Sequence, residues 1–312
     1  MKKNLLAIVI PYYKISYFQE LLSSLAKQTN LNFNLYIGDD NSPNSPIAII
    51  DKFREKLNIK YKKFNKNLGG INLVGQWDRC IDMIKDEEWI WLLPDDDIPS
   101  LNVVEEFYKA LKFKEHYKIK VFRFPLSIIN QESKVLKTLN YNNPLVESNL
   151  DFYQRVVRGK ASASLGDNIF HRQSLESSGG FVSFPKAWGS DHATILNVAS
   201  GGKIYFLSNA ILYFRMSGEN ISSDRSDGLI KLGARVEFAK WLKNNEYIFP
   251  KKLDSDFYKF FYWKGEYFIL SEWEFDLALF TKLYQLRKVC INNNIIPIVS
   301  IFFKKIKMEL LG

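Results

Sequence analysis

The chain has 312 residues, of which 46% are hydrophobic and 25% are charged, a balance typical of folded globular proteins. This composition excludes wholesale disorder, and no apolar stretch reaches the ~18 residues that a membrane-spanning helix needs. The net charge of +9 favours anionic partners such as diphosphates or anionic lipid, but the lysines are scattered, so no nucleic-acid groove is predicted.

The first hundred residues alternate short apolar runs with segments of helical spacing. Strands are predicted at Leu5–Ile10, Asn34–Ile37, Ile59–Phe64 and Trp89–Leu93, and helices at 16–28 (with Ser16 as N-cap), Pro46–Leu57 and Leu73–Lys85. Such alternation predicts an α/β fold with an open, mostly parallel sheet. Ligands bind this kind of sheet beyond the carboxyl ends of its strands.

The remaining two thirds give a mixed pattern and then a helical one. Helices are predicted at Val103–Phe113, Asp151–Arg158, Arg172–Ser178 and Asp191–Ala199. Lys120–Ile129 is predicted as a strand pair or one long strand, and Lys203–Leu207 and Ala210–Arg215 as a strand pair. From about residue 226 the pattern is mainly helical and rich in aromatic residues.

Two features bear on the cellular setting. Cys80 and Cys290 lie far apart in the sequence and form neither a metal motif nor a disulfide framework, so we expect a reducing, cytoplasmic environment. The N-terminus has two lysines before an apolar run, as signal peptides do. The run is too short and no cleavage site follows, so we expect a buried first strand.

Polar and acidic residues follow three of the predicted strands. Tyr12 and Tyr13 follow the first, Asp39 and Asp40 the second, and Asp95–Asp97 the fourth. Several carboxylates at one buried strand end repel one another and are costly to desolvate unless a cation offsets them. Mg²⁺ or Mn²⁺ fits, because such ions prefer oxygen ligands and bridge phosphates.

Each motif alone also has a simpler interpretation. The run Asp95–Asp97 can be a solvated turn that caps the helix near Leu101, and Asp39–Ser42 can be an Asx turn. A tyrosine after a strand is more often part of the core than a ring that stacks on a base. The occurrence of all three at the ends of one predicted sheet favours a binding site.

Four motifs occur in a specific order and spacing: Ile8–Tyr13 (IVIPYY), Gly38–Ser42 (GDDNS), Asn67–Gly70 (NLGG) and Leu92–Asp97 (LLPDDD). Together they resemble the family-two glycosyltransferases, which have the GT-A fold, and the resemblance covers residues 5 to about 220. It implies a nucleotide-sugar-binding half at 1–100, an acceptor-binding half at 101–222 and a C-terminal helical region at 223–312.

The resemblance implies roles for residues of the donor side. Asp39 matches the carboxylate that contacts the base, and Asp95 is expected near the ribose, with Asp96 or Asp97 on a Mn²⁺ or Mg²⁺ ion at the diphosphate. The family often has aspartate at the position of Pro94, so the choice of metal ligand stays open. The donor-binding residues that it implies are Pro11, Tyr12, Tyr13, Asp39, Asn67, Gly69, Gly70, Asp95 and Arg215.

A second block of matches lies at 170–172, 179–181 and 188–192. Asp191 occupies the place of the family's catalytic base, which removes a proton from the acceptor hydroxyl. The family usually has Glu-Asp where this chain has Ser190-Asp191, and the simpler interpretation, a helix N-cap, is compatible with catalysis. Trp188 and His192 are weaker candidates for acceptor contact. Arg215 is expected either to stabilise the leaving diphosphate or to form an ordinary ion pair.

The resemblance thus implies an inverting glycosyltransferase that uses a nucleotide sugar, with UDP favoured, and a glycan or lipid-linked glycan acceptor of bacterial surface polysaccharide. A nucleotidyltransferase is disfavoured because Pro11–Lys14 replaces the Gly-rich basic loop of those enzymes. A sugar-nucleotide or glycan-binding protein without activity stays open. The apolar, lysine-containing tail at 295–311 is either a helix lying on the inner face of the plasma membrane or a packed terminal helix.

Overall fold

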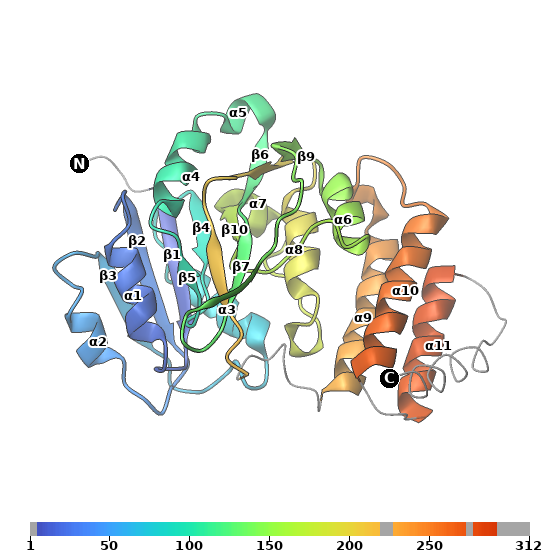
Figure 1. Cartoon of the computed structure of the whole chain (residues 1–312), viewed down its shortest axis with the longest axis horizontal. Coiled ribbons are helices and arrows are strands. Elements are labelled where there is room, and N and C mark those ends of the chain that lie inside the picture. Colours follow the sequence, from blue (N-terminus) through green and yellow to red (C-terminus); the bar gives the residue numbers. More distant parts are fainter. Residues whose placement is uncertain (1–4, 219–226, 273–276, 292–312) are drawn as a thin grey trace.

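The computed structural model describes residues 5–218, 227–272 and 277–291 of the chain. A central sheet has helices on both faces, and the helices of the C-terminal region pack together at one end of the molecule (Figure 1). The large sheet has the order β3-β2-β1-β4-β10-β6-β11-β9, and a smaller sheet has the order β5-β12-β7-β8.

The first half of the large sheet is parallel and consists of β1 (Leu6–Tyr12), β2 (Phe33–Asp39), β3 (Ile59–Lys63) and β4 (Trp89–Leu92). Alternate residues of β1 enter two hydrophobic clusters on opposite faces. Ala7 and Val9 pack with α3 (Leu73–Ile81), and Ile8 and Ile10 pack with α1 (Phe18–Ala26). Because both faces are covered, the strand is apolar throughout instead of alternating with polar residues.

The second half of the sheet is mixed. β10 (Asn168–His171) runs antiparallel between β4 and β6 (Ile119–Arg123), and β11 (Lys203–Phe206) is parallel to β6 and antiparallel to the edge strand β9 (Val146–Glu147). The smaller sheet contains β5 (Ile98–Pro99), β7 (Leu126–Ile129), β8 (Val135–Thr138) and β12 (Leu212–Arg215).

The other helical segments follow in chain order. They are α2 (Ile47–Asp51), α4 (Val103–Leu111), α5 (Lys114–Tyr117), α6 (Asn149–Val157), α7 (Arg172–Ser177), the 3₁₀ turn η1 (Pro185–Ala187), α8 (Ser190–Val198), α9 (Gly228–Asn244), the 3₁₀ turn η3 (Glu246–Ile248), α10 (Ser255–Glu272) and α11 (Leu277–Ile291).

The predicted pairing of strands and one predicted cap were wrong. The segments 203–207 and 210–215 do not pair with each other, because β11 joins the large sheet and β12 joins the small one. The segment 120–129, predicted as a strand pair or one long strand, forms the two strands β6 and β7, which also lie in different sheets. A local pattern indicates a strand but not its partner. The N-cap of α1 is Tyr17, with no side-chain cap bond, and not Ser16.

The C-terminal helices share one hydrophobic cluster with the second half of the sheet. Phe238, Phe261 and Leu286 belong to the same cluster as Phe184 and Ala193. The helical region is therefore packed onto the α/β part through an apolar interface. Within the described residues, the model contains no helix with the length and apolar character that crossing a membrane requires. The tail at 295–311 lies outside the described residues.

Candidate active site

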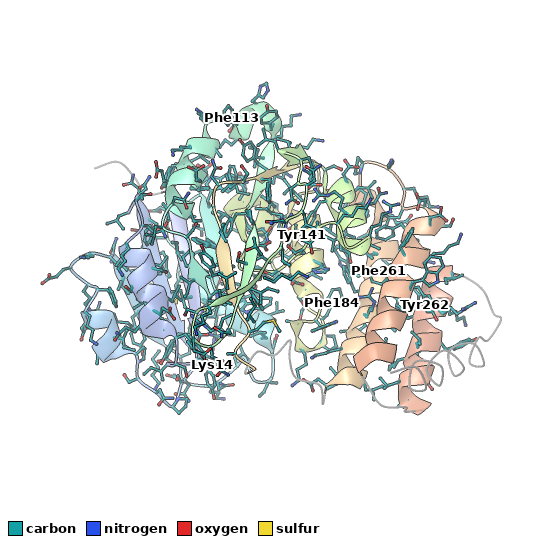
Figure 2. All side chains as sticks on the ribbon, in the orientation of Figure 1. Lys14, Phe113, Tyr141, Phe184, Phe261 and Tyr262 are labelled. Carbon is teal, nitrogen blue, oxygen red and sulfur yellow. The ribbon has the colours of Figure 1, made fainter. Side chains whose placement is uncertain are left out.

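The carboxyl ends of β1 and β4 are joined by Asp95. Its Oδ2 accepts hydrogen bonds from the backbone N–H groups of Tyr13 at 2.7 Å and Lys14 at 2.8 Å. Burial, with Asp96 as a further cause, raises the pKa of Asp95 to about 6, although the two N–H groups act in the opposite direction. Lys14 lies at the lower edge of the molecule in Figure 2.

Asp39 and Ser42 connect the carboxyl end of β2 to that of β1. Asp39 is buried, and its two oxygens accept from the N–H of Ser42 at 2.7 Å and from the hydroxyl of Tyr61 at 2.6 Å. Ser42 Oγ in turn donates to the carbonyl of Tyr13 at 2.6 Å. The structure thus brings Asp39 and Asp95 to one rim formed by the ends of three neighbouring strands, which we call the carboxyl rim.

Asp40, which the sequence analysis did not assign, holds the glycine-rich loop after β3. Its carboxylate accepts from the N–H groups of Leu68 at 2.6 Å and Gly69 at 2.8 Å, and it forms an ion pair with Arg79. A Cβ atom at Gly69 would lie 2.7 Å from Asp40 Oδ2, so the close approach requires glycine. Asn67 Oδ1 accepts from the N–H of the next glycine in this loop at 3.0 Å.

The two tyrosines after Pro11 lie in different environments. The Tyr12 ring is buried 4.6 Å from the Phe18 ring, and its hydroxyl donates to the Asn44 carbonyl at 2.8 Å. Tyr13 is 42% exposed. Successive residues of a strand point to opposite faces, so one tyrosine joins the core and the other reaches the rim. Only Tyr13 offers a ring face to a ligand, and the prediction of stacking does not extend to Tyr12.

Asp96 and Asp97 are both buried. Asp97 Oδ1 accepts from the N–H of Arg215 at 2.9 Å, whereas its Oδ2 has no hydrogen-bond partner among the described residues. Burial, with Asp96 as the next cause, raises the pKa of Asp97 well above its usual range. A buried carboxylate oxygen without a partner is costly, and a cation would relieve that cost.

The donor set at this end fits a divalent ion that is held jointly with a ligand. Among the described residues, no three His, Cys, Asp or Glu side chains come together in a way that could hold a metal. Mg²⁺ in nucleotide sites commonly takes one or two carboxylates and completes its shell with phosphate oxygens and water. Asp96 and Asp97 therefore suffice if a diphosphate is bound as well.

Arg215 contacts the acidic run from within the protein. It is 0% exposed, its Nε donates to the Asp96 carbonyl at 2.9 Å, and its Nη2 lies 2.7 Å from the Glu20 carboxylate. Its Nη1 donates to the turn at 130–133, and the guanidinium carbon lies 4.1 Å from the Tyr17 ring centroid. Arg215 thus forms a buried ion pair with Glu20, one of the two alternatives from the sequence, and its contact with the diphosphate stays a prediction.

Asp191 lies in the first turn of α8 and is partly exposed. The carboxyl ends of the first strands and the N-terminal end of α8 point to the same, lower side in Figure 1. The segment leading to α8 packs on α3, since the Trp77 and Phe181 ring centroids are 5.6 Å apart. Asp191 Oδ1 accepts from the N–H of His192 at 2.8 Å.

The two predicted acceptor residues are engaged within the protein. The His192 ring packs against Tyr153 at 5.7 Å and Phe238 at 6.2 Å, measured between centroids. The Trp188 ring lies 4.8 Å from Lys231 Nζ. These partners lie on α6 and α9, and the contacts give neither residue support as an acceptor contact.

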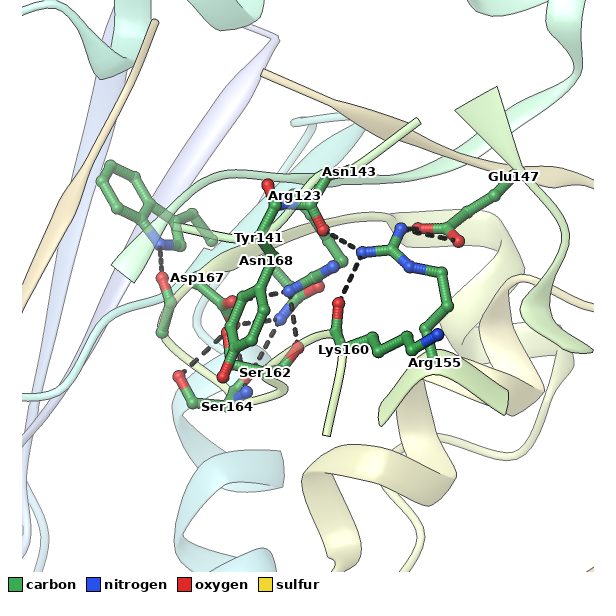
Figure 3. A network of polar contacts seen from close by, with 12 residues as sticks. Arg123, Tyr141, Asn143, Glu147, Arg155, Lys160, Ser162, Ser164, Asp167 and Asn168 are labelled. Carbon is green, nitrogen blue, oxygen red and sulfur yellow. Dashed lines mark hydrogen bonds and ion pairs between the residues drawn. The ribbon is translucent and has the colours of Figure 1, made fainter. Parts of the chain in front are cut away.

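A second polar network, which the sequence analysis did not assign, is formed around Arg123 and Arg155 (Figure 3). Arg123 Nη2 donates to the Ser162 carbonyl at 2.7 Å and lies 3.2 Å from Asp167 Oδ2. These bonds hold the loop before β10, in which a Cβ at Gly166 would come 3.4 Å from Asp97 Oδ2. The network therefore supports one wall of the acidic site.

Comparison with known proteins shows what the N-terminal part of the chain is similar to. Residues 7–154, just under half of the chain, match the family model described as Glycosyl transferase family 2. A stretch of 67 residues is 37% identical to the poly(ribitol-phosphate) beta-N-acetylglucosaminyltransferase TarS of Staphylococcus aureus. That stretch is 20% of this chain, and the match spans only 12% of the length of that relative.

Solved structures show the fold of this chain. TarS residues 1–349 in complex with UDP-GlcNAc superimpose with a TM-score of 0.70 and 17% identity, covering 91% of this chain and 81% of that chain. The mannosyltransferase PcManGT from Pyrobaculum calidifontis, in complex with GDP-Man and Mn²⁺, gives a TM-score of 0.55 and 15% identity, covering 98% and 80%. The fold is therefore GT-A, as the sequence predicted.

Proposed function

We propose that this chain is an inverting glycosyltransferase that moves a sugar from a nucleoside diphosphate sugar to an acceptor hydroxyl. The observation that carries the proposal is the carboxyl rim, where Asp95 and the pair Asp39–Ser42 join three strand ends within the segment that matches family 2. The names of TarS and of its UDP-GlcNAc complex support a UDP-sugar and a bacterial surface polysaccharide.

The donor side of the rim has the groups that a nucleotide requires. Tyr13, two residues after Pro11, supplies an exposed ring for the base. The buried carboxylate of Asp39, which is held by the Tyr61 hydroxyl, is the group that we assign to accept hydrogen bonds from the base. We assign Asp95, which bonds the backbone after Tyr12, to the ribose. The loop containing Asn67, Gly69 and Gly70 borders the same site, and Lys63 Nζ lies 3.3 Å from the Ser42 carbonyl, adding positive charge for a diphosphate.

Asp96 and Asp97 are the residues that we assign to a Mn²⁺ or Mg²⁺ ion. Such an ion, when bound, neutralises the negative charge that develops on the leaving diphosphate. The unpartnered Oδ2 of Asp97 supports this assignment. Arg215 keeps the two carboxylates in place through its bonds to the Asp96 carbonyl and the Asp97 side chain.

Asp191 acts as the catalytic base in this proposal. It takes the proton of the acceptor hydroxyl while that oxygen forms a bond to the anomeric carbon. The bond between the anomeric carbon and the diphosphate oxygen breaks in the same step, and the nucleoside diphosphate leaves. A single displacement of this kind inverts the anomeric configuration. Asp191 is the acidic residue in the first turn of α8. Its neighbour Ser190 is buried, and its Oγ accepts the Phe184 N–H.

A nucleotide-sugar screen tests the proposal. Thermal shift with UDP-GlcNAc, other UDP-sugars and GDP-mannose, in Mn²⁺ and in EDTA, should give a metal-dependent rise in Tm for one nucleotide class. The same mixtures, assayed for nucleoside diphosphate release, should show turnover. Binding without release would identify a binding protein, and pyrophosphate release from UTP and a sugar phosphate would identify a nucleotidyltransferase. Absence of any nucleotide shift would end the proposal.

We also propose a cytoplasmic location, with peripheral association at the inner face of the plasma membrane through the tail at 295–311. The support is the apolar run with Lys304, Lys305 and Lys307 in the sequence. Flotation with anionic liposomes should recover the full chain and lose a chain ending at Asn294. Equal flotation of both would reject this role of the tail.

A further inference from the structure

The backbone that leads into α8 is strained. Lys186, Ala187 and Gly189 have φ angles of 54°, 55° and 86°, all in the left-handed region. Residues other than glycine rarely adopt this region, and each such residue costs on the order of 1–3 kcal/mol. A strained conformation persists only where its surroundings hold it. Asp191 follows this loop after only one further residue, so whatever holds residues 185–189 also sets the start of α8.

Helix α9 contacts this loop at three points. Asp227, which precedes the helix, lies 3.2 Å from Lys186 Nζ through its Oδ2. Lys231 Nζ lies 4.8 Å from the centroid of the Trp188 ring. The Phe238 ring lies so close to Gly189 that a Cβ there would come within 3.0 Å of its Cδ1.

The three α9 residues share one face of the helix. Asp227, Lys231 and Phe238 are four and then seven positions apart, a spacing that returns to the same side of an α-helix. All three are buried. We call these residues the α9 clamp. A buried lysine and a buried aspartate are uncommon on a helix whose only task is apolar packing.

Phe238 joins both sides of the strained loop. Its ring centroid lies 5.4 Å from that of Phe184, before the loop, and 6.2 Å from that of His192, after it. Phe184 is further fixed by its N–H, which donates to Ser190 Oγ at 3.0 Å. Figure 2 shows Phe184 on the side of the α/β part that faces the C-terminal helices. One aromatic ring thus holds the entrance and the first turn of α8 together.

We propose that the α9 clamp is a positioning device for Asp191, so that the C-terminal helical region is part of the catalytic apparatus. The proposal rests on the role of Asp191 proposed above. The carboxyl rim, by contrast, is held by hydrogen bonds among its own loops. Loosening the clamp therefore misplaces the base and leaves nucleotide binding intact.

The first experiment compares Phe238→Ala with Phe249→Ala. Phe249 is buried in the same hydrophobic cluster but follows α9 and lies outside the clamp. We expect both variants to lose stability, since each removes a buried ring. Only Phe238→Ala should lower kcat for UDP release from UDP-GlcNAc, by about tenfold or more, while its Kd for UDP with Mn²⁺ stays within about twofold. Phe238→Leu should restore part of kcat.

Hydrogen exchange of the backbone amides supplies a readout that does not depend on activity. Phe238→Ala should speed exchange at residues 185–193, and Phe249→Ala should leave this segment unchanged. Equal exchange in the two variants would overturn the clamp even if the wild-type chain proves to have no transferase activity. Faster exchange with unchanged kcat in an active enzyme would show that the clamp holds the loop without serving Asp191, which also rejects the proposal.

A second pair of variants tests the charged part of the clamp. Lys186→Met removes the ion pair with Asp227, and Lys240→Met removes an exposed lysine from the outer side of α9. We expect a fall in kcat of about twofold to fivefold for the first and none for the second, because a partly exposed ion pair is worth up to about 1 kcal/mol. Equal kcat in both would remove Lys186 and Asp227 from the clamp.

Discussion

The two halves of the site hold their carboxylates in different ways. In the first half, Asp39, Asp40 and Asp95 each accept backbone N–H groups from loops at the ends of β1, β2 and β3. In the second half, Asp191 bonds the N–H of its own neighbour, and the loop before it is held by side chains of α9. Donor binding is therefore built into the rim of the sheet, whereas the placement of the base depends on packing from a distant segment.

The largest effect is expected for Asp191→Asn, which tests whether the second half of the site supplies the base. The amide keeps the oxygen that accepts the His192 N–H but cannot take a proton, so kcat should fall by about 10²- to 10⁴-fold. The Kd for UDP with Mn²⁺, measured by calorimetry, should stay within about twofold. Asp151→Asn, in the first turn of α6, is the matched control and should keep full activity. Near wild-type turnover in the Asp191 variant would remove it as the base.

Arg215→Lys tests whether Arg215 supports the acidic run on the donor side. Lysine keeps the charge but has no Nε to donate to the Asp96 carbonyl, so the acidic run should loosen. We expect the Mn²⁺ affinity, read by electron paramagnetic resonance with UDP present, to fall about tenfold, a loss comparable to that of other supporting residues around metals. UDP binding in EDTA should not change. Weaker UDP binding in EDTA would show instead that Arg215 contacts the diphosphate directly.

The sequence predicted the rim because its causes are local. The central strands β1 and β4 are predicted by unbroken apolar runs, and parallel strands bring their carboxyl ends to one edge. Tyr12 and Tyr13 are separable on the same grounds. The strand continues to Tyr12, so alternation along it places Tyr12 in the core and Tyr13 at the rim.

The second half was harder to predict because its determinants lie far apart in the chain. The strands at 203–207 and 210–215 look like a hairpin locally, yet each finds its partner in another sheet. Phe238 reads as an ordinary core aromatic of a helix, and no pattern near Gly189 reveals that this ring will lie against it. The sequence around Arg215 does not indicate that this side chain is buried, because its partners, Glu20 and the turn at 130–133, are distant in the chain.

Tyr13→Ala tests the exposed tyrosine with a smaller expected effect. Loss of one ring that stacks on a base should weaken UDP binding by roughly 1–3 kcal/mol, and Tyr13→Phe should bind as the wild type does. Tyr12→Phe is the matched control. It removes the hydroxyl that donates to the Asn44 carbonyl, so stability should fall by about 0.5–1.5 kcal/mol with no change in Kd. Equal Kd values for Tyr13→Ala and the wild type would exclude stacking by this ring.

The smallest expected effect is on the pH dependence of stability, and it arises from His171 in the strand pair β4–β10. His171 lies opposite Trp89 at the amino end of β4, away from the rim, and its Nδ1 lies 2.9 Å from Ser174 Oγ. Burial lowers the pKa of His171 below its usual value, with Lys114 and Lys120 acting in the same direction and the carboxylates of Glu88 and Glu115 against it.

The unfolded chain therefore binds more protons than the folded one as pH falls below about 6.5, the ordinary pKa of histidine, so the free energy of unfolding should decrease there. Urea unfolding of wild type and His171→Gln between pH 7.5 and about 5 measures this. We expect the variant to lose less stability over that range than the wild type. Only the difference between the two proteins is assigned to His171, because Asp95, whose pKa burial raises to about 6, titrates in the same range in both and would weaken UDP binding in both. An equal loss of stability in the two proteins would show that His171 does not set this pH dependence.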